Sequence, residues 1–149
     1  MKKIAVASLC DVPVLAELLN DLFSQEHEFV PDLAKQTAGL EKIVSTPAIG
    51  EILVLKIDHR IVGMVSLLYS ISTALGGRVA TLEDMIIHKD YRRKGLGKEL
   101  FQEAIDFSKK RNCLRLTLLT GRNNEVAIKF YQHFGLKRSG MIPLRLVFD

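Results

Sequence analysis

One stretch of the sequence constrains the fold most strongly, because a strand runs through a basic glycine loop directly into a helix. Apolar residues 85–87 predict the end of the strand, and residues 92–98 predict the loop and the first turn of an amphipathic helix. A helix N-terminus presents unpaired N–H groups and the positive end of the helix dipole, so it attracts phosphate. Gly95 and Gly97 lack the Cβ atoms that would keep a phosphate away from the backbone. The pattern therefore predicts a pyrophosphate site.

The side chains of this loop add positive charge at the same place. We expect the pyrophosphate to be held by Arg92, Arg93, Lys94, Gly95, Leu96, Gly97 and Lys98. Arginine suits bidentate contacts with oxyanions, and lysine contributes further charge. Two common nucleotide loops do not fit, because no Walker A string occurs and Leu100 interrupts a Rossmann G-x-G-x-x-G pattern. The remaining pattern, R-x-x-G-x-G, is by itself also compatible with a basic loop that only caps a helix.

A second block of sequence, residues 124–135, makes the combination specific. It reads Asn-Glu-Val-Ala-Ile-Lys-Phe-Tyr-Gln-His-Phe-Gly. Together the two blocks resemble the GNAT family of acetyl-CoA-dependent N-acetyltransferases. The pyrophosphate motif of that family, Q/R-x-x-G-x-G/A, is matched by Arg92, Gly95 and Gly97, and its later motif N-x-x-A-x-x-F-Y-x-x-x-G-[FL] by Asn124, Ala127, Phe130, Tyr131, Gly135 and Leu136. Residues 82–87 are also similar to the central strand of the family.

The resemblance implies a fold and a cofactor for the chain. The fold is a single α/β domain over residues 1–149, with a mixed central sheet flanked by helices. Two parallel strands of the sheet splay apart, and acetyl-CoA, the acetyl donor, binds in the opening. Backbone N–H groups of Met85, Ile86 and Ile87 are implied as donors to the thioester carbonyl of this cofactor.

The resemblance also implies a role for Tyr131 as the partner of the departing thiolate. Asn124 and Tyr131 are seven residues apart, so they fall on nearly the same face of a helix and can address one ligand. Both are therefore expected to bind the cofactor. The alternative is that Tyr131 belongs to an aromatic core stripe with Phe130 and Phe134.

Glu83 and Asp84 lie on the strand that leads into the basic loop. Neighbouring residues of a strand face opposite sides, so at most one of the two should point into a given cleft. An acidic residue at this place, acting through water, resembles the catalytic base of several family members. We predict Glu83 as this base and Asp84 as the substitute; the alternative is a core or substrate-orienting role.

The acceptor is the least defined part of the expected reaction. The resemblance implies a primary amine of a small molecule or peptide that contacts residues 25–30 and residues 70–76. Glu26 and Glu28 could attract a cationic amine, although solvated surface carboxylates are a common alternative. Amino sugar, antibiotic, peptide N-terminus and protein lysine all remain open. A non-catalytic acyl-CoA sensor or interaction module is the alternative to an enzyme.

Composition narrows the protein class. A chain of 149 residues with 48% hydrophobic residues suits one domain with a proper core. No apolar run is long enough to span a bilayer, and no signal peptide pattern follows the first residues, so we expect no membrane partner. Cys10 and Cys113 lack disulfide-redox or metal spacing and the histidines are scattered, which predicts no metal and two reduced thiols in a cytoplasmic protein.

A net charge of +4 and a pI near 9.1 raise the question of nucleic-acid binding. Such binding needs basic residues spread over a face, with aromatic residues for stacking or a known motif. The densest basic cluster instead lies on the expected phosphate loop, and tryptophan is absent. We therefore do not expect a nucleic-acid partner.

Periodicity and turn residues predict the remaining elements. Strands are expected at 3–7, 51–57, 61–69, 79–87, 114–120, 136–139 and 144–148, and helices at 11–23, 31–45, 96–111 and 124–134. The C-terminal segment from Met141 to Phe148 is apolar, and an uncovered apolar edge is an aggregation liability. Pairing of this segment with a second copy in a homodimer is one remedy, and protection of the edge by Pro143, which has no N–H, is the alternative.

Overall fold

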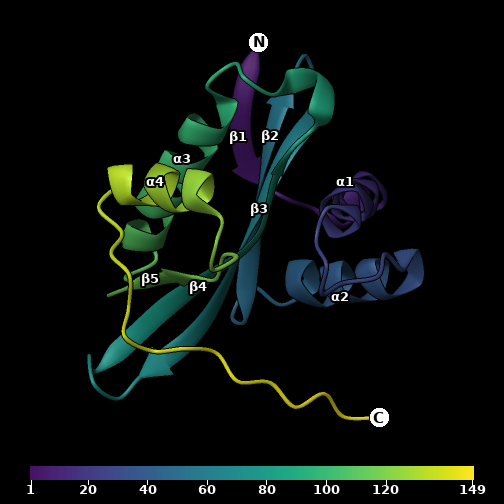
Figure 1. The fold of residues 1–149 in the computed structure, drawn as a ribbon. Coiled ribbons are helices and arrows are strands. Elements are labelled where there is room, and N and C mark those ends of the chain that lie inside the picture. Colours follow the sequence, from purple (N-terminus) through teal and green to yellow (C-terminus); the bar gives the residue numbers. More distant parts are fainter. The chain divides into compact units, whose positions relative to one another are not determined.

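The computed structural model describes residues 1–149, and up to its last helix the elements follow the predicted order (Figure 1). The elements are β1 (Lys2–Val6), η1 (Leu9–Asp11), α1 (Val12–Ser24), α2 (Leu33–Ser45), β2 (Gly50–Ile57), β3 (Arg60–Ser72), β4 (Gly77–Ile87), η2 (Lys89–Tyr91), α3 (Leu96–Lys110), β5 (Leu116–Leu118) and α4 (Glu125–His133). No helix is both long enough and apolar enough to cross a bilayer. The chain divides into two compact units, Met1–Leu119 and Thr120–Asp149.

The first unit is built on a five-stranded sheet in the order β1-β2-β3-β4-β5. Its first four strands pair antiparallel, and β5 pairs parallel to β4. Helices α1 and α2 cover one face of the sheet and α3 covers the other (Figure 1). The mixed sheet flanked by helices is the architecture that the sequence predicted.

The two parallel strands pair over a short segment only, because β5 ends at Leu118. They pair only from Ala80 with Leu116 to Leu82 with Leu118, whereas β4 continues to Ile87. The second half of β4 therefore has no strand partner on its β5 side. Backbone groups along this side are open to an extended ligand, because an unpaired strand edge presents N–H and C=O groups.

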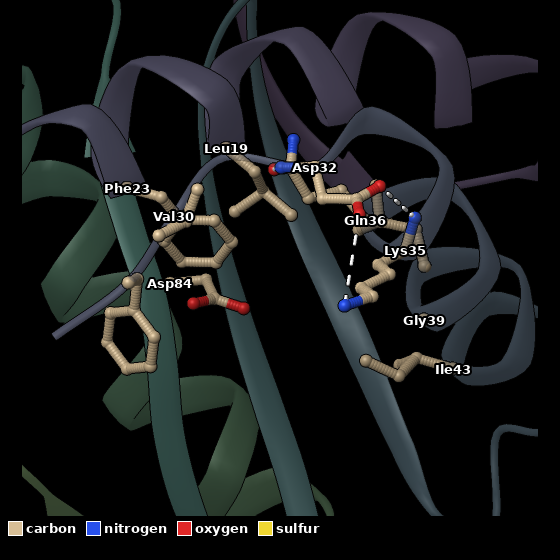
Figure 2. Close-up of a pocket in the computed structure, with 11 residues that line it drawn as sticks. Leu19, Phe23, Val30, Asp32, Lys35, Gln36, Gly39, Ile43 and Asp84 are labelled. Atoms are coloured by element: carbon tan, nitrogen blue, oxygen red, sulfur yellow. Dashed lines mark hydrogen bonds and ion pairs between the residues drawn. The ribbon is translucent and has the colours of Figure 1, made fainter. Parts of the chain in front are cut away.

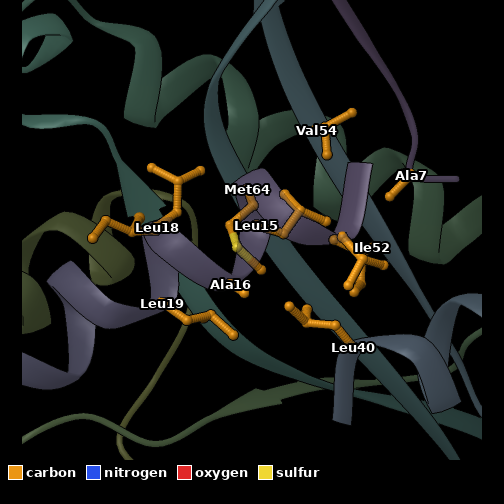
Figure 3. Close-up of a cluster of buried hydrophobic side chains, with 11 residues drawn as sticks. Ala7, Leu15, Ala16, Leu18, Leu19, Leu40, Ile52, Val54 and Met64 are labelled. Carbon is orange, nitrogen blue, oxygen red and sulfur yellow. The ribbon is translucent and has the colours of Figure 1, made fainter. Parts of the chain in front are cut away.

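Apolar residues of α1 form the core between the helices and the sheet. Leu15, at 0% exposure, packs in a cluster with Ile52 of β2, Met64 of β3 and Leu40 of α2 (Figure 3). This spacing of buried residues on α1 is that of an amphipathic helix with one face against a sheet. The cluster fixes α1 and α2 on the sheet.

One buried polar side chain joins the two helices. The Gln36 amide nitrogen of α2 donates to the Ala16 carbonyl of α1 at 2.9 Å, and its oxygen accepts from the backbone N–H of Asp32 at 2.7 Å. A buried amide is costly unless it is hydrogen-bonded, and here both ends have partners. Gln36 therefore holds the start of α2 against α1.

Helix α3 is anchored on the opposite face of the sheet. Leu100 and Phe101 are fully buried. At the C-terminal end, Arg111 forms a bidentate ion pair with the buried carboxylate of Glu51, at 2.7 and 3.0 Å, and the Tyr69 hydroxyl donates to the same carboxylate at 2.9 Å. These contacts fix the orientation of α3, and with it the position of its N-terminus.

The second unit contains α4 and the segment after it. The helix ends in a Schellman motif, in which Gly135 has φ of 94°, its N–H donates to Gln132, and the next N–H donates to Tyr131. Gly135 thus lies directly after the helix that the sequence predicted at 124–134. Phe130 contacts Tyr131 and Phe134 through ring pairs with centroids 5.4 and 5.3 Å apart.

The two predicted closing strands, 136–139 and 144–148, are wrong. The structure has no strand after α4. A strand needs a neighbour to pair its backbone groups, and this unit contains no other strand to provide one. The apolar side chains of the segment are strongly exposed, with Leu144 at 89% and Phe148 at 85%.

Candidate functional site

A β-bulge lies in the middle of β4, next to the two acidic residues. Met64 of β3 pairs with Ile86, whereas Ser66 pairs with Glu83, so two residues of β4 stand against one residue of β3. Asp84 is the first of these two and has φ of 52°. Left-handed backbone is unusual for a residue with a side chain, and aspartate tolerates it better than most. Strained backbone of this kind clusters at functional sites.

The bulge interrupts the alternation of side chains along β4. Glu83 is directly opposite Ser66 and so shares its face of the sheet, the face below α1 and α2. Asp84 lines a pocket on the same face, while the Met85 side chain lies toward α3, with its methyl group 3.9 Å from the position of a Cβ added at Gly97. The register thus places both carboxylates on one side of the sheet, but only Asp84 lines the pocket, which agrees with the expectation of at most one carboxylate in a given cleft.

This pocket, which we name the α1–α2 pocket, has a volume of about 300 Å³ (Figure 2). It lies between α1, the segment after it, α2 and the bulge of β4. Its walls are mainly apolar and include Leu19, Phe23, Phe29, Val30, Leu40 and Ile43. Phe23 and Phe29 contact each other with ring centroids 5.4 Å apart. The volume is at the lower end of the range for small-molecule sites.

Asp84 is the carboxylate that lines the α1–α2 pocket. Burial raises its pKa to about 6, and the nearby carboxylates of Glu83 and Glu26 contribute to the rise. Burial and Glu28 also raise the pKa of Glu26. A carboxylate with a pKa close to neutral can both accept and release a proton near physiological pH. By contrast, Glu83 is exposed.

The predicted phosphate loop lies between β4 and α3, as the sequence indicated. Gly95 is the N-cap of α3, with φ of 77°, and no side chain caps the helix. The N–H groups of the first turn therefore have no intrahelical acceptor and no side-chain acceptor. A Cβ at Gly95 would meet nothing within 4 Å, and one at Gly97 only the Met85 methyl group. The space in front of both glycines is thus open, which fits the approach of a diphosphate.

The cations of the loop are all on its surface. Arg92, Arg93, Lys94 and Lys98 are exposed. Arg92 donates from Nε to the carbonyl of Ile87 at 2.9 Å, which fixes its guanidinium beside the end of β4. Lys94 lies over the Tyr91 ring, with Nζ 5.3 Å from the centroid. This arrangement of helix N-terminus, glycines and cations suits binding of a pyrophosphate.

The second sequence block forms α4. Asn124 is its N-cap, and the side-chain oxygen accepts from the Ala127 N–H at 3.2 Å. The structure thus gives the asparagine and alanine of the motif a capping role, and the predicted contact of Asn124 with cofactor stays a prediction. Burial raises the pKa of the Tyr131 hydroxyl, which therefore stays protonated at neutral pH.

No group of three or more histidine, cysteine, aspartate or glutamate side chains is placed to hold a metal ion. Both Cys10 and Cys113 are free thiols.

Comparison with known proteins identifies the family. The model of the acetyltransferase (GNAT) family matches residues 13–136. The chain belongs to this family. The match includes the β4 bulge, the phosphate loop and α4.

Individual relatives are similar over parts of the chain. Glucosamine 6-phosphate N-acetyltransferase of Trypanosoma brucei brucei is 33% identical over 79 residues, which cover 52% of this chain and 52% of that enzyme. [Ribosomal protein bS18]-alanine N-acetyltransferase of Escherichia coli K12 is 35% identical over 60 residues, 40% of each chain. The chain thus spans about half the length of these curated relatives or less.

Solved structures agree over the whole length. The crystal structure of a possible acetyltransferase from Clostridium difficile 630 superposes with a TM-score of 0.88, covering 99% of both chains at 19% identity. Glucosamine-6-phosphate N-acetyltransferase from Arabidopsis thaliana gives a TM-score of 0.76 at 22% identity, covering 100% of this chain and 99% of that one. At these identities the likeness concerns the fold.

In the first unit, the structure brings together three of the predicted features: the carboxylates at the bulge, the open side of Met85–Ile87, and the loop at Arg92–Lys98. Sequence reasoning did not anticipate the apolar walls that α1 and α2 give to the α1–α2 pocket. It did predict acceptor contact for residues 25–30, and Phe29 and Val30 of that segment line the pocket.

Proposed function

We propose that this chain is an N-acetyltransferase that moves the acetyl group of acetyl-CoA to a primary amine of a small molecule or peptide. The observation that carries the proposal is the uncapped N-terminus of α3. There, open space in front of Gly95 and Gly97 adjoins exposed arginine and lysine side chains. Family membership supports acetyl-CoA as the ligand of such a site.

The residues that hold acetyl-CoA in this proposal belong to both sequence blocks. Backbone N–H groups and cations from Arg92 to Lys98 bind the pyrophosphate, and the open side of β4 at Met85–Ile87 hydrogen-bonds the extended part of the cofactor. Asn124 and Tyr131 contribute from α4. When bound, acetyl-CoA supplies an activated thioester carbonyl.

The protein residues move the protons of the reaction. An alkyl amine is protonated at neutral pH and must lose a proton before it can act as a nucleophile. Asp84 accepts this proton, directly or through water. It takes the role that the sequence predicted for Glu83, which is exposed. As the amine nitrogen bonds to the acetyl carbon, the carbon–sulfur bond breaks, and Tyr131 donates a proton to the leaving sulfur. The proton released by the new amide nitrogen restores the tyrosine hydroxyl.

A substitution at the start of α3 tests whether this site binds acetyl-CoA. Gly97→Asp adds a negative charge where the phosphate approaches, so acetyl-CoA affinity measured by calorimetry should fall at least about tenfold, the loss of one charge-assisted contact or more. The fold should survive, because the added Cβ has room and an acidic residue in the first turn suits the helix dipole. Gln102→Glu places the same charge on the exposed face of α3 as a control. Equal acetyl-CoA affinity in a folded Gly97→Asp protein would contradict the proposal.

A second candidate is a domain that binds acyl-CoA without turnover. Tight acetyl-CoA binding combined with no thiol release across a broad amine panel would favour it. The carboxylate at the bulge and the protonated tyrosine on α4 argue for an enzyme, because a sensor needs neither.

The wider setting is also a proposal. The two free thiols support the predicted cytoplasmic location. The exposed apolar segment at 141–148 supports self-association of two copies. The acceptors named for relatives differ in kind, a phosphorylated amino sugar in one and a protein alanine in another, so family membership leaves the acceptor open.

A further inference from the structure

The chemistry of the α1–α2 pocket is that of an apolar site with one charged end. Phe23 on α1, Val30 after it and Ile43 on α2 face a common opening, and the carboxylate of Asp84 lies at its β4 side (Figure 2). Apolar walls with a small number of placed polar groups are typical of sites for small organic ligands. Such walls suit an apolar body, and such a carboxylate suits a cationic group.

The charged end selects a cation. Glu83 and Glu26 lie close enough to Asp84 to raise its pKa, so three carboxylates gather on this side. Lys35 is the cation among the lining residues, and its ammonium is paired with Asp32 at 3.9 Å with the side chain 88% exposed. No arginine lines the pocket. A phosphorylated sugar would bring its negative charge against these carboxylates without a bidentate partner.

The pocket lies next to the strand segment that leads into the predicted phosphate loop at Arg92–Lys98. Asp84 lines the pocket on one face of the sheet, and the side chain of its chain neighbour Met85 lies toward Gly97 at the start of α3 on the other face. The two sides meet where β4 loses its β5 partner, after Leu82. A group held by Asp84 is therefore next to the strand segment that we assign to the thioester.

We propose that the α1–α2 pocket binds the acceptor as a small primary ammonium on an apolar aryl or branched alkyl body, with Asp84 holding the ammonium. This inference rests on the proposed function and specifies its substrate class. The carboxylates around Asp84, the lack of a lining arginine and the apolar walls disfavour a phosphorylated amino sugar, the substrate for which one relative is named.

The first test compares probes of matched shape. 2-Phenylethylamine and 2-phenylethanol differ in the ammonium, and glucosamine 6-phosphate tests the alternative class. Ligand-observed NMR should give at least about tenfold tighter binding for the amine than for the alcohol, as expected for a charge-assisted hydrogen bond. Asp84→Asn should remove that difference. In thiol-release assays, 2-phenylethylamine should be acetylated faster than glucosamine 6-phosphate, and the reverse order would overturn the inference.

The second test fills the pocket. A Cβ at Gly39 of α2 would meet nothing within 4 Å, so Gly39→Leu places its side chain in the pocket without a backbone clash. The variant should raise KM for 2-phenylethylamine at least about tenfold, because about 300 Å³ leaves little spare room. Ala38→Leu adds the same bulk to an exposed position that does not line the pocket and should change nothing. Gly39→Ala is a second control: it removes the glycine but adds only a methyl group, so its effect on KM should be much smaller than that of Gly39→Leu.

The outcomes separate this inference from the proposed function. Acetyl-CoA binding that is intact in Gly39→Leu, with an unchanged KM for the amine, would overturn the pocket assignment alone. Amine binding that depends on Asp84, in a protein with no affinity for acetyl-CoA, would overturn the proposed function alone.

Discussion

At the scale of single residues, Asp84 combines three properties. It lies in left-handed backbone, it lines an apolar pocket, and burial together with neighbouring carboxylates raises its pKa to about 6. Left-handed backbone is strained, and an ionised carboxylate buried without a cation is costly, so Asp84 lowers the stability of the fold. Residues held at a cost to stability are concentrated at functional sites. Asp84 is therefore a better candidate than Glu83 for the group that handles the amine.

Asp84→Asn should lower kcat/KM at least about tenfold, because a general base contributes 10²–10⁴-fold and the amide cannot accept the proton. The carboxylate form of Asp84 is populated above its pKa of about 6, so wild-type kcat/KM should rise as pH increases through this value. The variant should lose that rise. A pH profile of kcat/KM measures both effects.

Glu83→Gln is the matched control for this profile. Since Glu83 contributes to the raised pKa of Asp84, its neutralisation should move the rise to lower pH without abolishing it. If Glu83→Gln loses the increase of kcat/KM with pH and Asp84→Asn retains it, Glu83 is the general base.

Thermal unfolding provides a second readout for the same variant. A raised folded-state pKa means that the native state binds the proton of Asp84 more tightly, so stability is lost as pH rises from 3.8 through about 6. Asp84→Asn has no carboxyl group to ionise, so it does not lose this stability as the pH rises. Its Tm should exceed that of wild type at pH 8, and the difference should shrink toward pH 4.

Tyr131 is the second residue whose role can be separated from packing. Tyr131→Phe keeps the ring and its contact with Phe130 and removes only the proton donor. If the hydroxyl protonates the leaving thiolate, kcat should fall at least about tenfold while acetyl-CoA affinity and Tm stay close to wild type. A core tyrosine would show the opposite pattern, a shifted Tm with unchanged kcat. The assay must be limited by chemistry, which a single-turnover measurement establishes.

At the scale of elements, the strand, loop and helix from β4 to α3 could be predicted because their pattern is local. Apolar residues at helical spacing and two glycines lie within one short stretch, and the structure confirms Gly95 at the helix start with positive φ. The end of α4 was predictable for the same reason, since Gly135 is a recognisable C′ residue.

The bulge and the pocket could not be predicted in this way. A bulge depends on a one-residue difference in register between β3 and β4, and Asp84 itself is the only residue there that suits left-handed backbone. The pocket brings together α1, the following segment, α2 and β4, which are distant in the sequence. Alternation along β4 indicated that at most one of the two carboxylates enters a given cleft, but it could not tell that Asp84 is the one that lines the pocket.

At the scale of the whole molecule, the family match runs from residue 13 to residue 136 and so includes parts of both compact units. A single domain over residues 1–149 stays a prediction. The incorrect closing strands show why the last residues are harder to predict. An apolar alternating segment can form a strand, but its own sequence does not specify which strand would pair with it.

The partner that we propose for this segment is the same segment of a second copy. Its large apolar side chains are exposed: Met141, Ile142, Leu144, Leu146, Val147 and Phe148 range from 67% to 89%. Exposed apolar residues scattered singly are ordinary, but a contiguous group of this kind marks an interface. Two copies related by a two-fold axis would cover both groups and pair their backbones on either side of Pro143, which has no N–H to donate.

The double variant Leu144→Lys and Leu146→Lys tests this pairing. Burial of each leucine contributes roughly 1.5–3 kcal/mol, so loss of both should weaken self-association at least about a hundredfold. Light scattering at micromolar concentration should give a dimer mass for wild type and a monomer mass for the variant. Val126→Lys is the control, because Val126 is an 83% exposed apolar residue on α4 outside the segment. Since the two leucines lie far along the chain from the α3 N-terminus, acetyl-CoA affinity should be retained in the variant, and a monomer mass for wild type would exclude the pairing.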